Sequence, residues 1–366
     1  MSWQVALVLL SLGALSIVCH SNYTTSDGEE VLESMWEYSA AHGETNELVY
    51  PNESDDEISD DVDKQKGGKP HEHVIHMYFA LTNMNANREQ LFLRYANSLL
   101  RHTQSHLQIH AVVDAGGKQA VSKIIIDSKS ERGLVVDVQF YDVNEMAKQV
   151  EAIVDSLREH FSAGQRSHYH NPIFFLPALL HRLLPESVKK VIVLDTDMEF
   201  RADISSLHGL FDSFSEHHIM GLAYDQQPVY RHILHMYRRE HPGTHVGAPP
   251  PNGLAGFNSG CVLMDLEKMR GSELYNKALQ GEYVKSLADK FYFQGHLGDQ
   301  DFYSLLSMEH DDMFYILPCT WNRQLCTWWK DHGYGDVFDE YNKCEGKVNL
   351  YHGNCNTPIP QDDEVM

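Results

Sequence analysis

Two acidic residues at the end of a predicted buried strand are the clearest candidates for chemistry in this sequence. Val191 to Leu194 are four apolar, mostly β-branched residues, a pattern typical of a strand buried on both faces. Asp195 and Asp197 follow directly. Two carboxylates one residue apart at the carboxyl edge of an α/β sheet can share one divalent cation. The pattern therefore predicts a metal site, and the alternative is a strand exit with solvated acids.

A second strand exit supplies a candidate third ligand. Val348 to Tyr351 predict a short strand, and His352 follows it. Most lone histidines are structural, but an imidazole here could complete a site with Asp195 and Asp197. Two carboxylates and one imidazole, with positions left for phosphate oxygens and water, suit Mn²⁺ or Mg²⁺ better than structural zinc.

These residues must be positioned by the strands and helices that precede them, which alternate along the chain. The order predicts an α/β fold with a mostly parallel sheet and helices on both faces. No glycine-rich dinucleotide motif or P-loop follows the first strand, which argues against both of those nucleotide sites. The strands are expected at 74–80, 107–115, 134–143 and 191–194, and the main helices at 91–100, 146–160 and 173–185.

The pattern is less regular after Asp197. We expect a long surface loop at 241–256 because this stretch is rich in proline and glycine. Asp299 is expected to cap a helix whose apolar face begins at Phe302. The other expected elements are a strand at 219–224, a turn and buried strand at 257–264, and a helix at 272–291.

The composition describes an acidic globular protein. The chain has 366 residues, 42% of them hydrophobic, which is enough for a substantial core. Its formal net charge is -23, so a nucleic-acid partner is excluded in the absence of a basic patch. The expected folded domain covers residues 71–366.

The amino-terminal segment has the features of a protein that enters the secretory pathway. The apolar run at 4–18 predicts a signal-anchor or a cleaved signal peptide over residues 1–21. Residues 22–70 are polar and acidic and predict a lumenal stem. Asn22 and Asn52 lie in N-glycosylation patterns.

Four late cysteines are better explained by two disulfides than by a metal site, because an oxidising compartment is expected and close Cys-x-x-Cys pairs are absent. Three pairings are open, of which we favour Cys319 with Cys344 and Cys326 with Cys355. Cys261 is expected to be a free thiol in the core.

Taken together, VIVLDTDMEF, FNSGCVLMDL, HLGDQDFYSLL and YHGN resemble the retaining glycosyltransferases related to glycogenin and the bacterial galactosyltransferases. They occur in the right order at suitable spacings. QPVYRH, GAPPPNGLAGFNSG, CTWNRQLCTWW and YHGNCNTPIP resemble, within that family, the enzymes that add xylose in α-1,3 linkage to xylose-α-1,3-glucose on EGF repeats such as those of Notch. The resemblance covers about residues 72–362 and makes 71–366 a catalytic GT-A domain.

The resemblance implies a metal-dependent transferase with UDP-xylose as donor and Mn²⁺, or Mg²⁺, as its metal. Gln300 would stabilise the anomeric centre, and Asp299 would orient the donor's hydroxyls. The implied metal ligands are Asp195, Asp197 and His352, and the implied donor-binding residues are Asn258, Ser259, Gly260, Asp195 and Asn354.

Retention of configuration has two explanations here. Gln300 is a poor nucleophile, so we favour front-face attack in which a donor phosphate oxygen accepts the acceptor's proton. Covalent catalysis by Asp299 is the alternative.

Bacterial relatives have a lysine after the metal-binding His-Gly pair, but this chain has Asn354 and Asn356 there. Backbone amides or these asparagines must then contact the diphosphate.

The implied acceptor is an EGF-repeat glycoprotein that carries xylosyl-glucose. Trp328, Trp329 and Asn322 are candidates to bind it, while core packing beside the disulfides is the alternative for the tryptophans. The resemblance also favours a signal-anchor, placing the enzyme in the endoplasmic reticulum membrane with a lumenal catalytic domain, and a homodimer stays open.

Other function classes remain as alternatives. A related UDP-sugar transferase could use another donor or acceptor, for example UDP-xylose with O-linked glucose. Phosphatases of the haloacid dehalogenase type also have DxD at a strand end, but Glu199 stands where they carry Thr or Val. An inactive lumenal binding protein is the third alternative, although usable residues fill every metal and donor position.

Overall fold

The computed structural model describes residues 74–126, 133–162, 164 and 168–361. The predicted amino-terminal segment, the acidic stem, Asn22 and Asn52 lie outside these residues. Within the described ranges, no helix has both the length and the apolar character that crossing a membrane requires.

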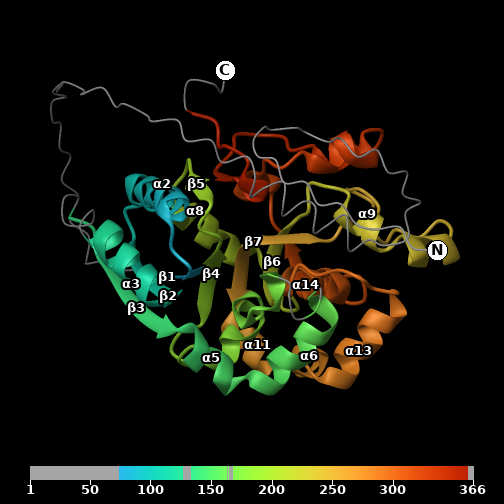
Figure 1. Cartoon of the computed structure of the whole chain (residues 1–366), viewed down its shortest axis with the longest axis horizontal. Coiled ribbons are helices and arrows are strands. Elements are labelled where there is room, and N and C mark those ends of the chain that lie inside the picture. Colours follow the sequence, from blue (N-terminus) through green and yellow to red (C-terminus); the bar gives the residue numbers. More distant parts are fainter. Residues whose placement is uncertain (1–73, 127–132, 163, 165–167, 362–366) are drawn as a thin grey trace, which may run out of the picture.

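A seven-stranded sheet forms the centre of the molecule, in the order β3-β2-β1-β4-β7-β6-β8 (Figure 1). Strands β3, β2, β1 and β4 are parallel, as expected, whereas β7 is antiparallel to both β4 and β6. The strands are β1 (Val74–Leu81), β2 (His106–Val113), β3 (Val136–Asp142), β4 (Lys190–Leu194), β6 (Met220–Tyr224), β7 (Phe257–Asp265) and β8 (Phe314–Ile316).

Helices cover both faces of this sheet (Figure 1). On one side lie α2, α3 and α8, and on the other lie α5 to α7 and α11 to α14. The helices are α2 (Ala86–His102), α3 (Ala115–Val121), α5 (Val143–Gln149), α6 (Glu151–Phe161), α7 (Leu180–Leu183), α8 (Ile204–His208), α9 (Val229–Ile233), α10 (His235–Glu240), α11 (Leu266–Gly271), α12 (Glu273–Ala278), α13 (Gly281–Lys290), α14 (Asp299–Ser307) and α15 (Phe338–Asn342).

The apolar run in β4 is buried on both faces, as its sequence predicts. Val191 and Val193 pack in the core with α6 and α14, and Ile192 and Leu194 pack in the core with α2 and α8. This alternation follows from the two-residue period of a strand. It fixes the end of β4, and therefore the place where the chain leaves the sheet.

A second, three-stranded sheet crosses the carboxyl end of β4, in the order β5-β10-β9. It is made of β5 (Met198–Phe200), β10 (Leu350–His352) and β9 (Arg323–Gln324). Strand β10 is antiparallel to β5 and parallel to β9. His352 is therefore the last residue of a strand rather than the first residue after one.

The segment after His352, residues 353–361, lies along β5 and α2, and we call it the strap. Gly353 N–H donates to the Asp197 carbonyl oxygen at 2.9 Å. Arg94 donates to the carbonyl of Ile359 at 3.0 Å, and Arg201 to that of Pro360 at 2.8 Å. Both arginines also pair with Glu199. The strap is thus tied to Asp197 itself, to α2 and to the residue that follows β5.

Three predicted helices differ from the structure for local reasons. The expected helix at 173–185 is a series of 3₁₀ turns at 172–174 and 177–179 followed by α7. Prolines start both turns, and a proline inside a helix removes a hydrogen bond and clashes with the preceding turn. The expected helix at 146–160 is divided at Val150, and that at 272–291 is divided before Gly281.

Asp299 does not cap α14, contrary to the prediction. It is the first helical residue, and the preceding Gly298 has φ 69°, a conformation that favours glycine. A Cβ on Gly298 would also lie 2.9 Å from the Phe174 carbonyl oxygen. The Asp299 carboxyl group is instead directed toward Ser259 of β7.

Candidate active site

The Asp195-Thr196-Asp197 turn lies at the junction of the two sheets. Asp195 N–H donates to the Gly260 carbonyl oxygen at 2.8 Å and extends the β4–β7 ladder by one bond. Beyond Asp197 the chain enters β5, where Met198 pairs with His352 of β10. The fold therefore brings together residues that are far apart in the sequence.

The three predicted metal ligands meet as expected. His352 Nε2 lies 3.5 Å from Asp195 Oδ2 and 3.4 Å from Asp197 Oδ1. One ligand atom from each residue lies within 4.8 Å of the others. This set of two carboxylates and one imidazole fits a single Mn²⁺ or Mg²⁺ ion, with positions left for a donor's phosphate oxygens.

The charges in this triad are coupled. Burial and the neighbouring charge of Asp197 raise the pKa of Asp195 to about 6, although 58% of its side chain reaches solvent, which screens part of the repulsion. Burial acts in the same direction on Asp197, but the charge and hydrogen bond of His352 bring its pKa below the usual value. Burial lowers the pKa of His352, and the two acids reverse this and raise it. The two acids thus favour the protonated form of His352, and a bound cation would take the place of that positive charge.

Gly260 allows the imidazole to reach the two acids. A Cβ on Gly260 would lie 2.3 Å from His352 Cε1 and 2.6 Å from Nδ1. Side chains do not approach so closely, so the imidazole would have to move. The structure thus gives Gly260, predicted as a donor-binding residue, a further role as the surface on which His352 lies.

The residues expected to hold the donor lie together beside the triad. Asn258 Nδ2 donates to Gln300 Oε1 at 3.2 Å, and Ser259 N–H donates to the same oxygen at 3.2 Å. Ser259 Oγ donates to Asp299 Oδ1, also at 3.2 Å. Strand β7 and the start of α14 are therefore joined by their polar side chains.

Asp299 lies in an environment that favours a neutral carboxyl group. Its side chain is buried, and burial together with the charge of Asp195 raises its pKa well above the usual range. A protonated carboxyl group can donate a hydrogen bond but is a poor nucleophile. This favours a positioning role for Asp299 over the covalent alternative.

Three residues that the sequence analysis did not select, Asp225, Tyr230 and Asp301, extend the hydrogen-bonded group around Gln300. Gln300 Nε2 donates to Asp225 Oδ2 at 3.4 Å and lies at the same distance from the Tyr230 hydroxyl. Tyr230 donates to Asp301 Oδ1 at 2.9 Å. Burial raises the pKa of Asp225 and of Asp301 to about 7. Asp225 directly follows β6, so the strand-exit criterion that selected Asp195 could have identified it.

The three candidate acceptor residues have different environments. Trp329 is fully buried and packs on His232 and Tyr334, which agrees with the core-packing alternative. Trp328 is half-buried and stacks on His332 with 3.6 Å between ring centroids. Asn322 is fully buried and bonds to Asn258 and His352, so it has no surface available for an acceptor.

The carboxyl-terminal disulfides agree with the favoured pairing. Cys319 bonds to Cys344, and Cys326 bonds to Cys355, while Cys261 is a buried free thiol. Asn354 Oδ1 accepts hydrogen bonds from the backbone of Leu325 and Cys326, both at 2.9 Å. This oxygen ties the start of the strap to the loop after β9, and the diphosphate contact of Asn354 stays a prediction.

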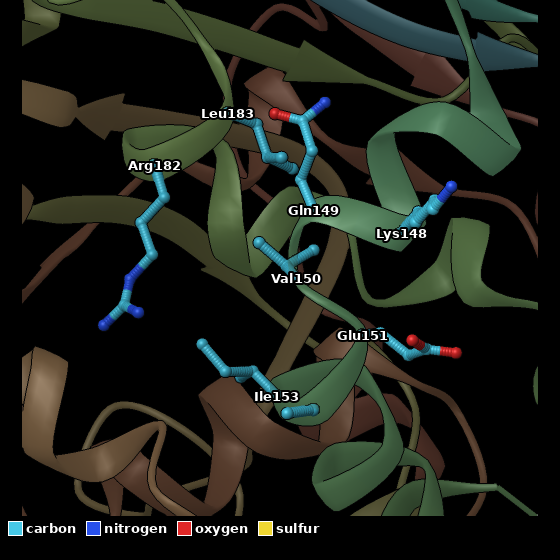
Figure 2. A pocket seen from close by; sticks show the side chains of 8 residues that line it. Lys148, Gln149, Val150, Glu151, Ile153, Arg182 and Leu183 are labelled. Atoms are coloured by element: carbon cyan, nitrogen blue, oxygen red, sulfur yellow. The ribbon is translucent and has the colours of Figure 1, made fainter.

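A groove of about 440 Å³ lies between α5, α6 and α7, outside this site (Figure 2). It contains none of the metal, donor or acceptor candidates. Its lining residues are Lys148, Gln149, Val150, Glu151, Ala152, Ile153, Arg182 and Leu183.

Known proteins resemble this chain over most of its length. The family model "Glycosyl transferase family 8" matches residues 80–342. Human xyloside xylosyltransferase 1 is 44% identical over 301 residues, which cover 81% of this chain and 77% of the human protein. The mouse protein of the same name is 42% identical over 298 residues, covering 80% and 76%. The crystal structure of mouse xyloside xylosyltransferase 1 in its apo form has a TM-score of 0.75 and 41% identity, and the match covers 79% of this chain and 100% of that one.

Proposed function

Because this chain belongs to glycosyl transferase family 8, we propose that it transfers xylose from UDP-xylose with retention of configuration. The proposed product is an α-1,3 linkage to xylose-α-1,3-glucose on EGF repeats. One observation carries the proposal: a triad fit for a divalent cation lies beside the Asn258, Asp299 and Gln300 group. The names of the human and mouse relatives support xylose as the donor sugar and a xyloside as the acceptor.

The metal of this reaction would be Mn²⁺, held by Asp195, Asp197 and His352. When bound, it supplies positive charge next to the diphosphate as that group departs. Asp195 must lose its proton to become a ligand, and its raised pKa makes binding weaker below about pH 6. His352 contributes the neutral imidazole nitrogen that faces the two acids.

The protein's own side chains would orient the donor. Asn258 and Ser259 lie near the start of β7, and Asp299, held by Ser259, would hydrogen-bond the hydroxyls of the sugar. Two N–H groups donate hydrogen bonds to the side-chain oxygen of Gln300 and keep it in place. Its amide dipole is therefore fixed before UDP-xylose binds. Fixed dipoles stabilise developing charge without having to reorient during the reaction.

Front-face attack fits these residues better than a covalent intermediate. Gln300 carries no negative charge, and Asp299 favours its neutral form. The proton of the acceptor hydroxyl would pass to the departing phosphate oxygen on the same face, so no protein base is required. The bond from the anomeric carbon to the phosphate breaks as the new glycosidic bond forms.

We place the enzyme in the endoplasmic reticulum membrane with the catalytic domain in the lumen. The apolar run at 4–18, the acidic stem and the two disulfides support this assignment. EGF-repeat glycoproteins are the proposed partners and nucleic acid is not one of them, while a homodimer stays a proposal for measurement.

The decisive experiment compares the wild type with Asp197→Asn. Xylose transfer from UDP-xylose to an EGF repeat carrying xylose-α-1,3-glucose is measured with and without Mn²⁺. We expect transfer to require the metal and the substitution to reduce it about 100-fold or more, because a ligand charge at the reaction centre is lost.

Asp212→Asn is the matched control, since Asp212 is exposed and lies outside the site. It should transfer at the wild-type rate. Transfer from UDP-glucose in place of UDP-xylose would contradict the donor assignment, and phosphate release from small phosphoesters would favour the phosphatase alternative.

A further inference from the structure

Asn322 joins the metal triad to the donor-binding group. It follows the 3₁₀ turn at Cys319–Trp321 and immediately precedes β9, and its side chain is fully buried. Its Oδ1 lies 3.1 Å from His352 Nδ1, and its Nδ2 lies 2.9 Å from Asn258 Oδ1. Each end of this one carboxamide thus contacts a residue of a different functional group.

A backbone carbonyl fixes the orientation of the Asn322 amide. Asn322 Nδ2 also lies 3.4 Å from the carbonyl oxygen of Asn258, which can only accept a hydrogen bond. The NH₂ group must therefore face Asn258, and Oδ1 must face His352. Because Oδ1 can only accept, His352 Nδ1 must carry the proton. This tautomer leaves the Nε2 lone pair free on the side of Asp195 and Asp197.

The same reasoning extends to the reaction centre. Gly260 N–H donates to Asn258 Oδ1 at 3.1 Å, so the NH₂ group of Asn258 must face Gln300. Ser259 N–H donates to Gln300 Oε1, so the NH₂ group of Gln300 must face Asp225. A series of side-chain hydrogen bonds therefore connects His352 to Asp225 through Asn322, Asn258 and Gln300. In each bond, the residue nearer to His352 is the donor.

We propose that Asn322 is a positioning residue that holds His352 in its metal-binding tautomer and, together with the backbone N–H groups of Gly260 and Ser259, keeps the Asn258 and Gln300 amides in their orientations. The amide of Asn322 then connects the metal ligand His352 to the group around the reaction centre. This inference rests on the proposed function, because it assigns Asn322 a role in the metal-dependent reaction at that site. It replaces the predicted acceptor contact of this residue.

Two substitutions separate the two halves of the proposal. Asn322→Leu removes both hydrogen bonds, and we expect Mn²⁺ affinity to fall about 10- to 100-fold, as is usual when the partner of a metal-bound histidine is lost. Asn322→Asp keeps an oxygen that can accept a hydrogen bond from His352 Nδ1. It replaces the NH₂ group that donates a hydrogen bond to Asn258 with a second oxygen, which can only accept. We expect it to bind Mn²⁺ at least as well as the wild type, because a carboxylate partner increases the basicity of the imidazole.

The Asp variant should lose turnover rather than metal. Repulsion between its carboxylate and Asn258 Oδ1 would turn the Asn258 amide and displace Gln300. We expect kcat to fall about 10- to 100-fold at saturating Mn²⁺ and UDP-xylose, within the range for loss of one preorganised group. A purely structural role of Asn322 predicts equal effects of both variants on metal affinity and on kcat.

Gln324→Leu is the matched control. Gln324 is also a fully buried amide, and its backbone pairs with His352 in the β9–β10 ladder, but its side chain bonds to the backbone of Gln226 and Tyr224 instead of to His352 or Asn258. Mn²⁺ affinity is measured by calorimetry and electron paramagnetic resonance. A tenfold loss in Asn322→Leu with wild-type affinity in Gln324→Leu supports the proposal. Wild-type affinity in Asn322→Leu, or an equal loss in the control, overturns it.

A measurement on the unsubstituted protein covers the case in which the Leu variant does not fold. Nitrogen NMR of the metal-free enzyme at alkaline pH, where His352 is neutral, should show its proton on Nδ1. The other tautomer overturns the proposal. If the wild type binds Mn²⁺ and Asn322→Leu does not, but neither transfers xylose, the positioning role stands and the proposed substrate fails.

Discussion

The seven-stranded sheet and the three-stranded sheet supply different parts of the same metal triad, and they are stabilised in different ways. The end of β4, with Asp195 and Asp197, is fixed by apolar side chains buried on both faces. Strand β10, with His352, is short: its first residue, Leu350, packs in the core with Ile192 and Leu194, and its end is connected to its surroundings by a disulfide, by Asn322 and by the strap. The positions of the two acids therefore depend on the folding of the large sheet. The position of the histidine also depends on one disulfide and a few hydrogen bonds, each of which can be removed separately. A change in the small sheet should affect the metal site without unfolding the protein.

Ile192→Ala tests the large sheet and should have the largest effect. Ile192 is fully buried in β4, and its truncation should reduce the free energy of unfolding by about 4 kcal/mol through lost burial and a cavity. The protein that remains folded should keep wild-type Mn²⁺ affinity. Urea unfolding without metal gives the first quantity and calorimetry the second. A tenfold loss of affinity in folded protein would erase the distinction between the two sheets.

Removing each disulfide in turn tests the small sheet. The Cys326→Ser/Cys355→Ser and Cys319→Ser/Cys344→Ser variants should each lose about 3 kcal/mol of stability. Only the first should also weaken Mn²⁺ binding, because Cys355 lies in the strap, three residues after His352. Thermal unfolding and metal titration of both variants give the comparison. Equal Mn²⁺ affinities in the two variants would show that the Cys326–Cys355 bond does not position the histidine.

Gly260→Ala tests the contact between the two sheets. The new Cβ must displace the His352 imidazole, and we expect a loss of about 100-fold in transfer, the cost of a shift of about 1 Å at a reaction centre. Unfolding should change much less than activity does. Gly271→Ala is the control, because a Cβ there has no neighbour within 4 Å. Normal transfer by Gly260→Ala would mean that the imidazole position is not critical.

The pH dependence of stability tests the buried acids beside the triad. Burial raises the pKa of the fully buried Asp301 from 3.8 to about 7, so the folded state retains a proton that the unfolded state loses. Its contribution to stability is therefore greatest below pH 4 and falls as pH rises to about 7. We expect Asp301→Asn to reduce this pH-dependent loss by about 4 kcal/mol in the metal-free protein.

Urea unfolding at several pH values provides the measurement, and Asp212→Asn should keep the wild-type slope. An unchanged slope in Asp301→Asn would show that this carboxyl group is already ionised in the folded protein.

Much of the large sheet could be predicted because its signals are local. The β-branched run before Asp195 identifies a buried strand, and the acids after it identify the strand exit. The resulting fold agrees with the expected GT-A architecture and with the crystal structure of the mouse relative. The reversed direction of β7 was not predicted, since burial patterns are the same for parallel and antiparallel central strands. Prolines divided the helix expected at 173–185, and the apolar pattern alone does not show this.

The series of buried hydrogen bonds from His352 to Asp225 could be predicted only in part. Gln300 and Asn258 were selected from motifs, but the bonds of Asn322 connect residues far apart in the sequence. No local pattern reports which buried amide meets which partner. The sequence analysis predicts an acceptor contact for Asn322, whereas its burial and its bonds to Asn258 and His352 place it between the metal ligand and the donor-binding residues.

The strap also determines when the site can first exist. A nascent chain that has not yet reached His352 can already form β4 and present Asp195 and Asp197, but it lacks the third ligand. Even after His352 emerges from the ribosome, β10 depends on the residues that follow it, and Cys355 must be oxidised together with Cys326. The third metal ligand is therefore positioned only once the strap has been made, and chains in which Cys326 and Cys355 are reduced should bind the metal more weakly.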